Sequence, residues 1–221
     1  MSPDIRGSLP GMKFPRIALF AAILLPMLAW GAWLVAGHDE NYALQKLFFR
    51  ARYDRYDEWI IQAAARYGVS PSLVKAVIWR ESRFHPYMLG SHGERGLMQI
   101  TDGAAQDWAR AEKIGIFVPA DLLDPKTNIE VGTWYLANAL RRWSGKDDPI
   151  PFALAEYNAG RTRVIRWEKN SGLGGGFGAD DLHSIMDFPA TRAYIRSIVD
   201  RYLDFKKQGE FSGEKPANTP R

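Results

Sequence analysis

Apolar residues recur three and four positions apart along most of the chain after residue 52, which is the spacing of amphipathic helices. Stretches that alternate apolar and polar residues, as half-buried strands do, are few. One helical segment ends at Gly68, and its apolar positions are Tyr53, Tyr56, Trp59, Ile60, Ala63, Ala64 and Tyr67. The pattern predicts an all-α domain.

Capping residues predict where further helices begin. Ser70 stands before Pro71 and Asp124 before Pro125, so each pair places a side-chain oxygen ahead of a first-turn proline. Another helix is expected to start at Thr101 or Asp102. The remaining expected elements are helices over 149–158 and 162–167, a flexible glycine-rich loop over 171–178, and a last helix that starts at Phe188-Pro189 and runs through Phe205.

The N-terminal part carries a long apolar run without a charged residue, from Ile17 to Gly37. At about 1.5 Å per residue, a helix of this length crosses the roughly 30 Å hydrocarbon core of a bilayer. Basic residues precede the run and acidic residues follow it, which predicts that the rest of the chain lies outside the inner membrane. A cleaved signal peptide is the alternative, since small residues occur at Ala29-Trp30-Gly31 and Val35-Ala36-Gly37.

This pattern gives an expected domain organisation. The expected parts are a cytoplasmic basic N-terminus (1–16), a transmembrane anchor or signal peptide (17–37), a linker (38–52), a catalytic domain (53–207) and a disordered polar tail (208–221). On this basis the protein is expected in the inner membrane with residues 38–221 on the periplasmic side, or secreted if the N-terminal segment is removed.

Composition excludes several classes of protein. Of the 221 residues, 46% are apolar and none is cysteine, which excludes a disulfide-stapled or thiolate-zinc protein. The net charge of +4 comes from 29 Lys and Arg against 25 Asp and Glu, an excess too small to indicate a nucleic-acid partner. The histidines are not at metal-ligand spacings, and the glycine-rich loop lacks a phosphate-binding context. We therefore expect no metal and no cofactor.

Glu81 is the main candidate for chemistry. On the helix that Pro71 begins, it lies four residues after Val77 and three after Ile78, on the same apolar face. A carboxyl group on a buried face loses hydration, which raises its pKa. A carboxylic acid that stays protonated near neutral pH can protonate a glycosidic oxygen. An ordinary helix-end glutamate paired with Arg80 or Arg83 is the alternative.

Four short motifs occur in order along the chain: Glu81-Ser82, GLMQ at 96–99, YNAG at 157–160 and PATRAY at 189–194. Together they resemble the lytic transglycosylases of the soluble, goose-lysozyme-like group (glycoside hydrolase family 23), and the resemblance covers roughly residues 53–205. The resemblance implies a lysozyme-like helical fold and a peptidoglycan substrate. It also implies that Glu81 acts first as acid and then as base, so that cleavage between N-acetylmuramic acid and N-acetylglucosamine leaves 1,6-anhydromuramoyl ends.

The resemblance also implies substrate-binding residues. Gln99 and Met98 would line the sugar groove, Tyr157 and Asn158 would hold the N-acetyl group and the reacting ring, and Tyr194 would orient the substrate or Glu81. The sequence departs from the family pattern at three positions. Glu156 replaces an alanine, Ala190 replaces a glutamate, and Gly90 replaces a serine whose hydrogen bond Ser91 would supply.

Two alternatives to this function stay open from the sequence. A hydrolytic muramidase on the same fold would need a second carboxylate, for which the candidates are Glu94, Asp102 and Asp107. A non-catalytic peptidoglycan-binding module of an envelope assembly is the other alternative. The partners expected are glycan strands and the membrane, and the sequence names no protein partner.

Overall fold

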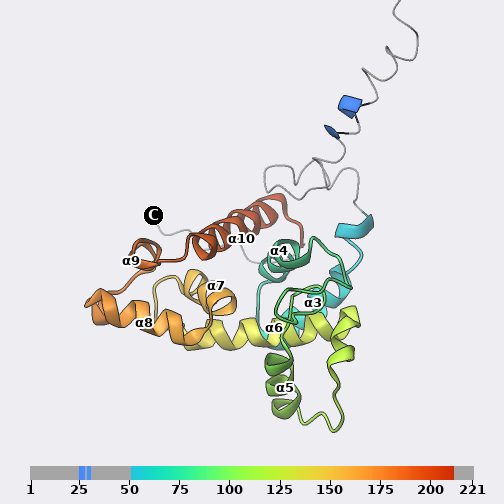
Figure 1. Ribbon diagram of the computed structural model, residues 1–221, viewed down its shortest axis with the longest axis horizontal. Helices are drawn as coiled ribbons and strands as arrows, with labels where there is room; N and C mark the ends of the chain where they lie inside the picture. The colour runs from blue at the N-terminus through green and yellow to red at the C-terminus, as the bar shows by residue number, and fades with distance from the viewer. Residues whose placement is uncertain (1–24, 28, 31–50, 212–221) are drawn as a thin grey trace, which may run out of the picture. The chain divides into compact units, whose positions relative to one another are not determined.

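The computed structural model describes residues 25–27, 29–30 and 51–211, and the chain divides into two units, Met1–Phe49 and Arg50–Arg221 (Figure 1). Among the described residues, no helix combines the length and apolar character needed to cross a bilayer. Most of the expected anchor at 17–37, the expected linker up to residue 50 and the tail from residue 212 lie outside the described residues.

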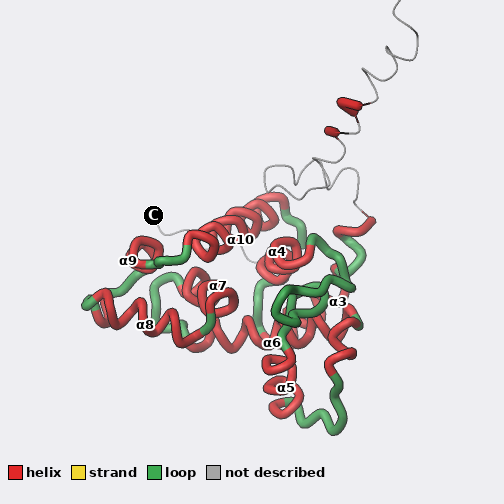
Figure 2. The backbone as a smooth tube through the Cα atoms, in the orientation of Figure 1, coloured by secondary structure: helices red, strands yellow, loops and turns green. Residues whose placement is uncertain are grey.

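The second unit is built from helices, and in the part of the chain that the structure describes the only strand-like pairings are two isolated bridges around Arg95 (Figure 2). The all-α prediction is confirmed. The helices are α3 (Asp57–Tyr67), α4 (Pro71–Ser82), α5 (Asp102–Ala111), η2 (Pro119–Leu123), α6 (Pro125–Arg142), α7 (Pro149–Ala159), α8 (Arg161–Ser171), η3 (Gly174–Gly176), α9 (Ala179–Ile185) and α10 (Pro189–Gln208).

The predicted helix starts are confirmed by side-chain caps. Ser70 Oγ accepts the Leu73 N–H at 3.3 Å, and Asp124 Oδ2 accepts the Thr127 N–H at 2.8 Å. At the third start Thr101, not Asp102, is the cap, since its hydroxyl oxygen accepts from the Ala104 N–H. These bonds satisfy N–H groups that the first turn of a helix leaves without a partner.

The expected flexible loop at 171–178 is more ordered than predicted. It contains the short helix η3, and Phe177 near its end is buried against Phe152. The Lys146 ammonium donates to the Phe177 carbonyl oxygen at 3.0 Å. Helix α9, which was not predicted, follows and buries Leu182. The sequence pattern did not predict that Phe177 is buried, because a single large apolar side chain creates no periodicity.

Helix α4 lies between α3 and α10, while α7 packs against both α6 and α10 (Figure 1). Nine of the twelve residues of α4 are buried, including every residue from Ser72 to Trp79. A helix that is apolar on every side needs neighbours on every side. The carboxyl end of α4 is thus held in a fixed position inside the domain, and this end carries Glu81.

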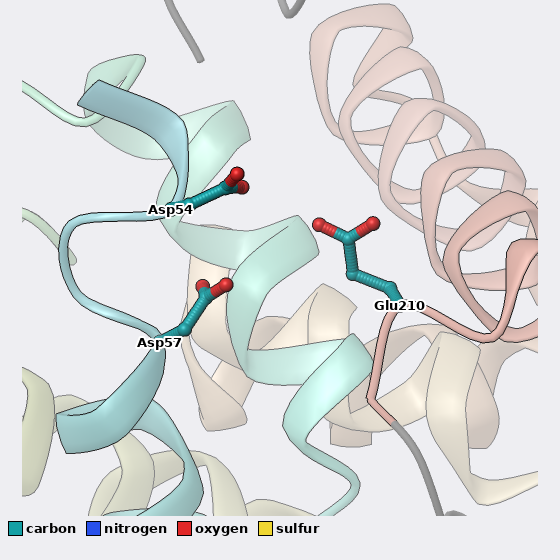
Figure 3. A group of neighbouring side chains, drawn as sticks. All are labelled: Asp54, Asp57 and Glu210. Atoms are coloured by element: carbon teal, nitrogen blue, oxygen red, sulfur yellow. The ribbon is translucent and has the colours of Figure 1, made fainter. Parts of the chain in front are cut away.

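Lys75 is a charged residue within the buried part of α4. Its ammonium group has no exposed surface and lies 2.7–3.2 Å from carboxylate oxygens of Asp54, Asp57 and Glu210. Figure 3 shows these three carboxylates converging from the segment before α3, the first residue of α3 and the segment after α10. The lysine therefore joins the start and the end of the domain to α4. Phe211, beyond the expected tail boundary at 208, is buried as well.

Candidate active site

Glu81 lies in the last turn of α4, just before Arg83 ends the helix in the left-handed conformation. Its Oε1 atom accepts a hydrogen bond of 2.6 Å from the hydroxyl of Tyr194 on α10. The side chain remains partly exposed, so a ligand can reach the carboxyl group. Residues 113 positions apart in the sequence thus form the centre of the site.

Desolvation by the surrounding protein raises the pKa of Glu81 from 4.5 to about 7. The hydrogen bond from Tyr194 and the positive charge of Arg80 both act to lower this pKa, and the negative charge of Glu94 acts to raise it. The loss of hydration outweighs the two stabilising contacts. At neutral pH a large share of the molecules therefore carries a protonated Glu81, as a general acid requires.

Two tyrosines lie next to Glu81, Tyr194 buried and Tyr157 partly exposed. The pKa values of Tyr157 and Tyr194 are well above the usual value, first because of burial and second because of the negative charge of Glu81. Both phenols therefore stay protonated and act as hydrogen-bond donors. Tyr194 donates to Glu81, and Tyr157 donates to the Met98 carbonyl oxygen at 2.9 Å.

The GLMQ segment is fastened to α4 and α6 through its backbone. Ser82 Oγ donates to the Leu97 carbonyl oxygen at 2.7 Å, and the Met98 N–H donates to Asn128 Oδ1 at 2.7 Å. The buried Asn128 amide also donates to the carbonyl oxygens of Arg95 and Leu122, both at 2.8 Å. Asn128 is a positioning residue that sequence reasoning missed, because a polar residue inside a helix carries no local signal of its tertiary partner.

Close packing explains the glycine at the start of this segment. Gly96 has a φ of 77°, and a Cβ atom there would overlap the Asn128 amide and approach the Leu122 carbonyl oxygen to 2.5 Å. A side chain at this position would displace the asparagine that holds the segment. Met98, which the resemblance placed along the sugar groove, has a fully buried side chain.

Gln99 has a positive φ of 49° and is partly exposed. Its Nε2 atom donates to the carbonyl oxygens of Met88, at 3.1 Å, and Gly96, at 2.9 Å. A Cβ atom at Gly90 would lie only 2.8 Å from Gln99 Oε1 and would overlap the Glu94 carboxylate. The glycine at position 90, where the family pattern has a serine, therefore leaves room for the side chains of Gln99 and Glu94. Ser91 is exposed, and its Oγ lies 3.0 Å from Nδ1 of the neighbouring histidine.

Asn158 lies exposed near the end of α7, and its Oδ1 accepts a hydrogen bond of 2.7 Å from Thr191 on α10. This bond fixes the amide plane and leaves the NH₂ group free to donate to a ligand. It also joins the YNAG motif to the PATRAY motif. The role of Thr191 was not predicted, although the residue belongs to a motif that was singled out.

The carboxylates proposed as second catalytic groups differ in their surroundings. Asp102 forms an ion pair with Arg95, and Asp107 forms one with Arg110. Glu94 is the only one of the three among the charges that shift the pKa of Glu81. Its own pKa is lowered by backbone hydrogen bonds, including the 2.9 Å bond from the His92 N–H.

Glu156 is buried away from this chemistry. It forms an ion pair with Arg142 and accepts a 2.8 Å hydrogen bond from the Trp143 indole N–H. It is absent from the charges that shift the pKa of Glu81. Its structural role is to join the start of the turn after α6 to α7, which explains a carboxylate inside an otherwise apolar helix.

Among the described residues, Asp54, Asp57 and Glu210 form the one acidic group close enough to hold a metal ion. The Lys75 ammonium contacts all three of these carboxylates. A lysine side chain therefore already supplies the cation. This group is a buried ion-pair cluster.

A helical domain that holds one partly desolvated glutamic acid at the end of its central helix, beside one buried and one partly exposed tyrosine, is of the lysozyme-like class. The chain belongs to the Transglycosylase SLT domain family, whose model matches residues 58–175.

Relatives and solved structures agree with this membership. The chain is 33% identical over 151 residues to soluble lytic murein transglycosylase of Escherichia coli K12, an alignment covering 67% of this chain and 22% of that protein. It is 35% identical over 121 residues to membrane-bound lytic murein transglycosylase C of Klebsiella pneumoniae, covering 52% of this chain and 34% of that protein. The chain thus spans between a fifth and about a third of the length of these relatives.

Two solved structures have a similar fold. The 70 kDa soluble lytic transglycosylase of Escherichia coli matches with a TM-score of 0.58 at 28% identity, over 76% of this chain and 25% of that one. An inactive mutant of the lytic transglycosylase Slt of Pseudomonas aeruginosa matches with a TM-score of 0.63 at 23% identity, over 74% of this chain and 25% of that one.

Proposed function

We propose that this protein is a peptidoglycan lytic transglycosylase that cleaves the β-1,4 bond between N-acetylmuramic acid and N-acetylglucosamine without water. The observation that carries the proposal is the reachable Glu81 carboxyl group, whose pKa of about 7 makes it both an acid and a base near neutral pH. Membership of the transglycosylase SLT family supports the substrate.

In the proposed reaction, protonated Glu81 donates its proton to the glycosidic oxygen, and the bond from that oxygen to the anomeric carbon of the muramyl residue breaks. The muramyl C6 hydroxyl then attacks the same carbon and gives its proton to the Glu81 carboxylate. The acid is regenerated, no water is consumed, and the product is a 1,6-anhydromuramoyl end. Because one carboxylate serves both steps, a pKa near the working pH suits both of its states.

The surrounding residues have supporting roles in this proposal. Tyr194 orients Glu81 through its 2.6 Å hydrogen bond and stabilises the carboxylate form. The free NH₂ group of Asn158 donates to the muramyl acetamide, which assists at the anomeric carbon. Gln99 and Ser91 contact sugar groups at the rim. Tyr157 and the Met98 backbone hold the floor of the site through their mutual hydrogen bond.

Mass spectrometry of muropeptides released from purified peptidoglycan by the full chain tests this proposal. The expected products are lighter than reducing muropeptides by one water, and the Glu81→Gln chain should release roughly 10²–10⁴-fold less of them. Reducing ends would show that the protein is a muramidase and not a transglycosylase. Absence of any product, with retention of the protein on the sacculi, would indicate a binding module.

A hydrolytic muramidase is a second candidate because Glu94 is close enough to influence Glu81 and has a lowered pKa. An ionised carboxylate could activate a water molecule. If Glu94 has that role, Glu94→Gln removes nearly all cleavage and the parent yields reducing ends. If cleavage is non-hydrolytic, Glu94→Gln keeps most activity and yields anhydro ends.

We propose further that the catalytic domain is attached to the inner membrane by residues 17–37, with the domain on the periplasmic side. The uncharged run and its flanking charges support this location. Fractionation of cells followed by protease treatment of spheroplasts tests it. A membrane-bound chain whose domain is digested from outside is expected, and a shortened chain in the soluble fraction would indicate a cleaved signal peptide.

A further inference from the structure

A cavity of about 260 Å³ lies between α3 and the start of α6. Its lining residues are Trp59, Gln62, Ala63, Arg66, Lys126 and Glu130. The four residues from α3 recur three and four positions apart and therefore share one face of that helix. None of the six is among the groups that bond Glu81 or shift its pKa. The cavity is separate from the candidate active site.

Trp59 gives this cavity a flat apolar wall. Trp59 is partly exposed, as Trp134 is, whereas the other tryptophans of the domain are buried: Trp79, Trp108, Trp143 and Trp167. The Trp59 ring packs against Tyr56 with the ring centroids 5.9 Å apart, which holds it in place. A fixed aromatic face beside polar groups matches a sugar ring, which has an apolar C–H face and a polar rim.

The polar groups in the cavity are also held in place. Arg66 forms ion pairs with Glu130 and with Glu112. Gln62 Nε2 donates to Glu58 at 3.2 Å, and its carbonyl oxygen can still accept a bond from a ligand. A planar guanidinium, a carboxylate and an amide together offer donors and acceptors to neighbouring hydroxyl groups. Little side-chain freedom is lost when a ligand binds to groups that are already fixed.

Lys126 adds a positive charge at the cavity. It is exposed in the first turn of α6 and forms no ion pair with any residue of the described chain. An ammonium group without a carboxylate partner suits a ligand that brings its own carboxylate. Muramyl residues of a glycan strand carry a lactyl group and a stem peptide with carboxylates, whereas a neutral sugar carries none.

We propose that this cavity is a second saccharide site, at which Trp59 stacks on a sugar residue of a glycan strand and Lys126 binds a carboxylate of its muramyl substituent. The inference rests on the proposed function for the identity of the polymer. The volume suits one sugar residue, because pockets for larger ligands start at roughly 300 Å³. A strand held here has its other part at a high effective concentration near Glu81.

Binding to uncleaved peptidoglycan tests the site directly. Sedimentation of the full chain with purified sacculi would compare Glu81→Gln alone with the same chain carrying Trp59→Ala or Lys126→Glu. The matched control is Lys169→Glu, the same charge change at an exposed lysine in the last turn of α8. Each cavity variant should weaken binding about fivefold or more relative to the control, since one of two linked contacts is lost. Binding equal to the control for both cavity variants overturns the site.

Kinetics separates this inference from the proposed function. In the chain with Glu81 intact, Trp59→Ala and Lys126→Glu should raise KM for sacculi about fivefold with kcat unchanged. A soluble tetrasaccharide that binds at the active site alone should be cleaved at an unchanged rate. Equal losses on both substrates would show that the residues act through the active site and would overturn the proposal. If the parent chain cleaves neither substrate, the proposed function fails while the sedimentation result still decides the second site.

Discussion

Two ionisable side chains on the same helix, the buried Lys75 and the partly exposed Glu81, have opposite surroundings. Lys75, in the first half of α4, is surrounded by three carboxylates, and its pKa is raised although burial alone would lower it. Glu81, at the end of α4, forms no ion pair within the described part of the chain, and desolvation raises its pKa to about 7. Three carboxylates compensate the positive charge of Lys75, whereas a large share of the molecules carries Glu81 in its protonated, neutral form near pH 7.

Lys75 stabilises the fold, whereas Glu81 serves the proposed reaction. The carboxylates around Lys75 offset the cost of burying its charge and bring three segments of the chain together. Glu81 is held by a neutral phenol, so its charged state stays costly and its proton stays available. A matched cationic partner would make Glu81 a permanent carboxylate and end its use as an acid. Four predictions test this contrast, from the largest expected effect to the smallest.

Replacing the acid should have the largest effect. Glu81→Gln keeps the shape of the side chain but cannot donate a proton, so cleavage of sacculi should fall roughly 10²–10⁴-fold. Release of soluble muropeptides measures the effect, and circular dichroism should show an unchanged helix content. Turnover close to that of the parent would mean that another residue is the acid.

Replacing the buried lysine should reduce stability and not chemistry. Lys75→Met leaves Asp54, Asp57 and Glu210 facing one another without a cation, which should lower the free energy of unfolding by about 3–5 kcal/mol at pH 7. Urea denaturation measures the change. Lys169→Met, at an exposed lysine, should stay within about 0.5 kcal/mol of the parent. If the two variants unfold alike, the cluster around Lys75 contributes no stability.

Removing the phenol beside Glu81 should change both rate and pH dependence. Tyr194→Phe deletes a hydrogen bond that lowers the pKa of Glu81, so this pKa should rise and the alkaline limb of the pH–activity profile should move to higher pH. The rate should fall about tenfold, because a hydrogen bond to a charged group contributes about 1.5–3 kcal/mol. Tyr202→Phe, at another buried tyrosine of α10, is the control. An unmoved alkaline limb would exclude Tyr194 from tuning the acid.

The smallest expected effect is the loss in the free energy of unfolding that the desolvated Glu81 carboxylate causes. The pKa of Glu81 is about 7 in the folded chain and 4.5 as an ordinary side chain, so the folded state loses stability as the pH rises from about 4.5 to 7. Glu81→Gln avoids this loss and should be more stable than the parent by about 1–2 kcal/mol at pH 8, allowing for solvent at this partly exposed group. At pH 4 the two should unfold alike. Denaturation at both pH values measures this, and a constant difference would contradict the raised pKa.

Local chemistry made much of the fold predictable. Ser70, Thr101 and Asp124 cap helices because their oxygens bond N–H groups within three residues, an interaction that the sequence alone contains. Glu81 was singled out by its place on an apolar helix face together with the motifs that follow it, and the helix face alone left an ordinary helix-end glutamate open. Helix α9 and the anchored Phe177 were missed, since each depends on one apolar contact without periodicity.

The partners of the polar residues were decided by the tertiary structure. The sequence left the direction of Glu156 open, and the fold buries it with Arg142 and Trp143. Asn128 holds Met98 from 30 positions away, and Thr191 fixes Asn158 from 33 positions away. A hydrogen bond requires two groups within about 3 Å, and no residue spacing along the chain encodes such a meeting.

The sequence by itself determined most of the helices, their caps and the candidate for the acid, because periodicity and capping act within a few residues. Only the tertiary structure decided that Tyr194 meets Glu81 and that Lys75 meets Glu210, over 113 and 135 positions of sequence. The pKa of Glu81 belongs to this second group, since it depends on how closely four packed segments exclude water from one carboxyl group.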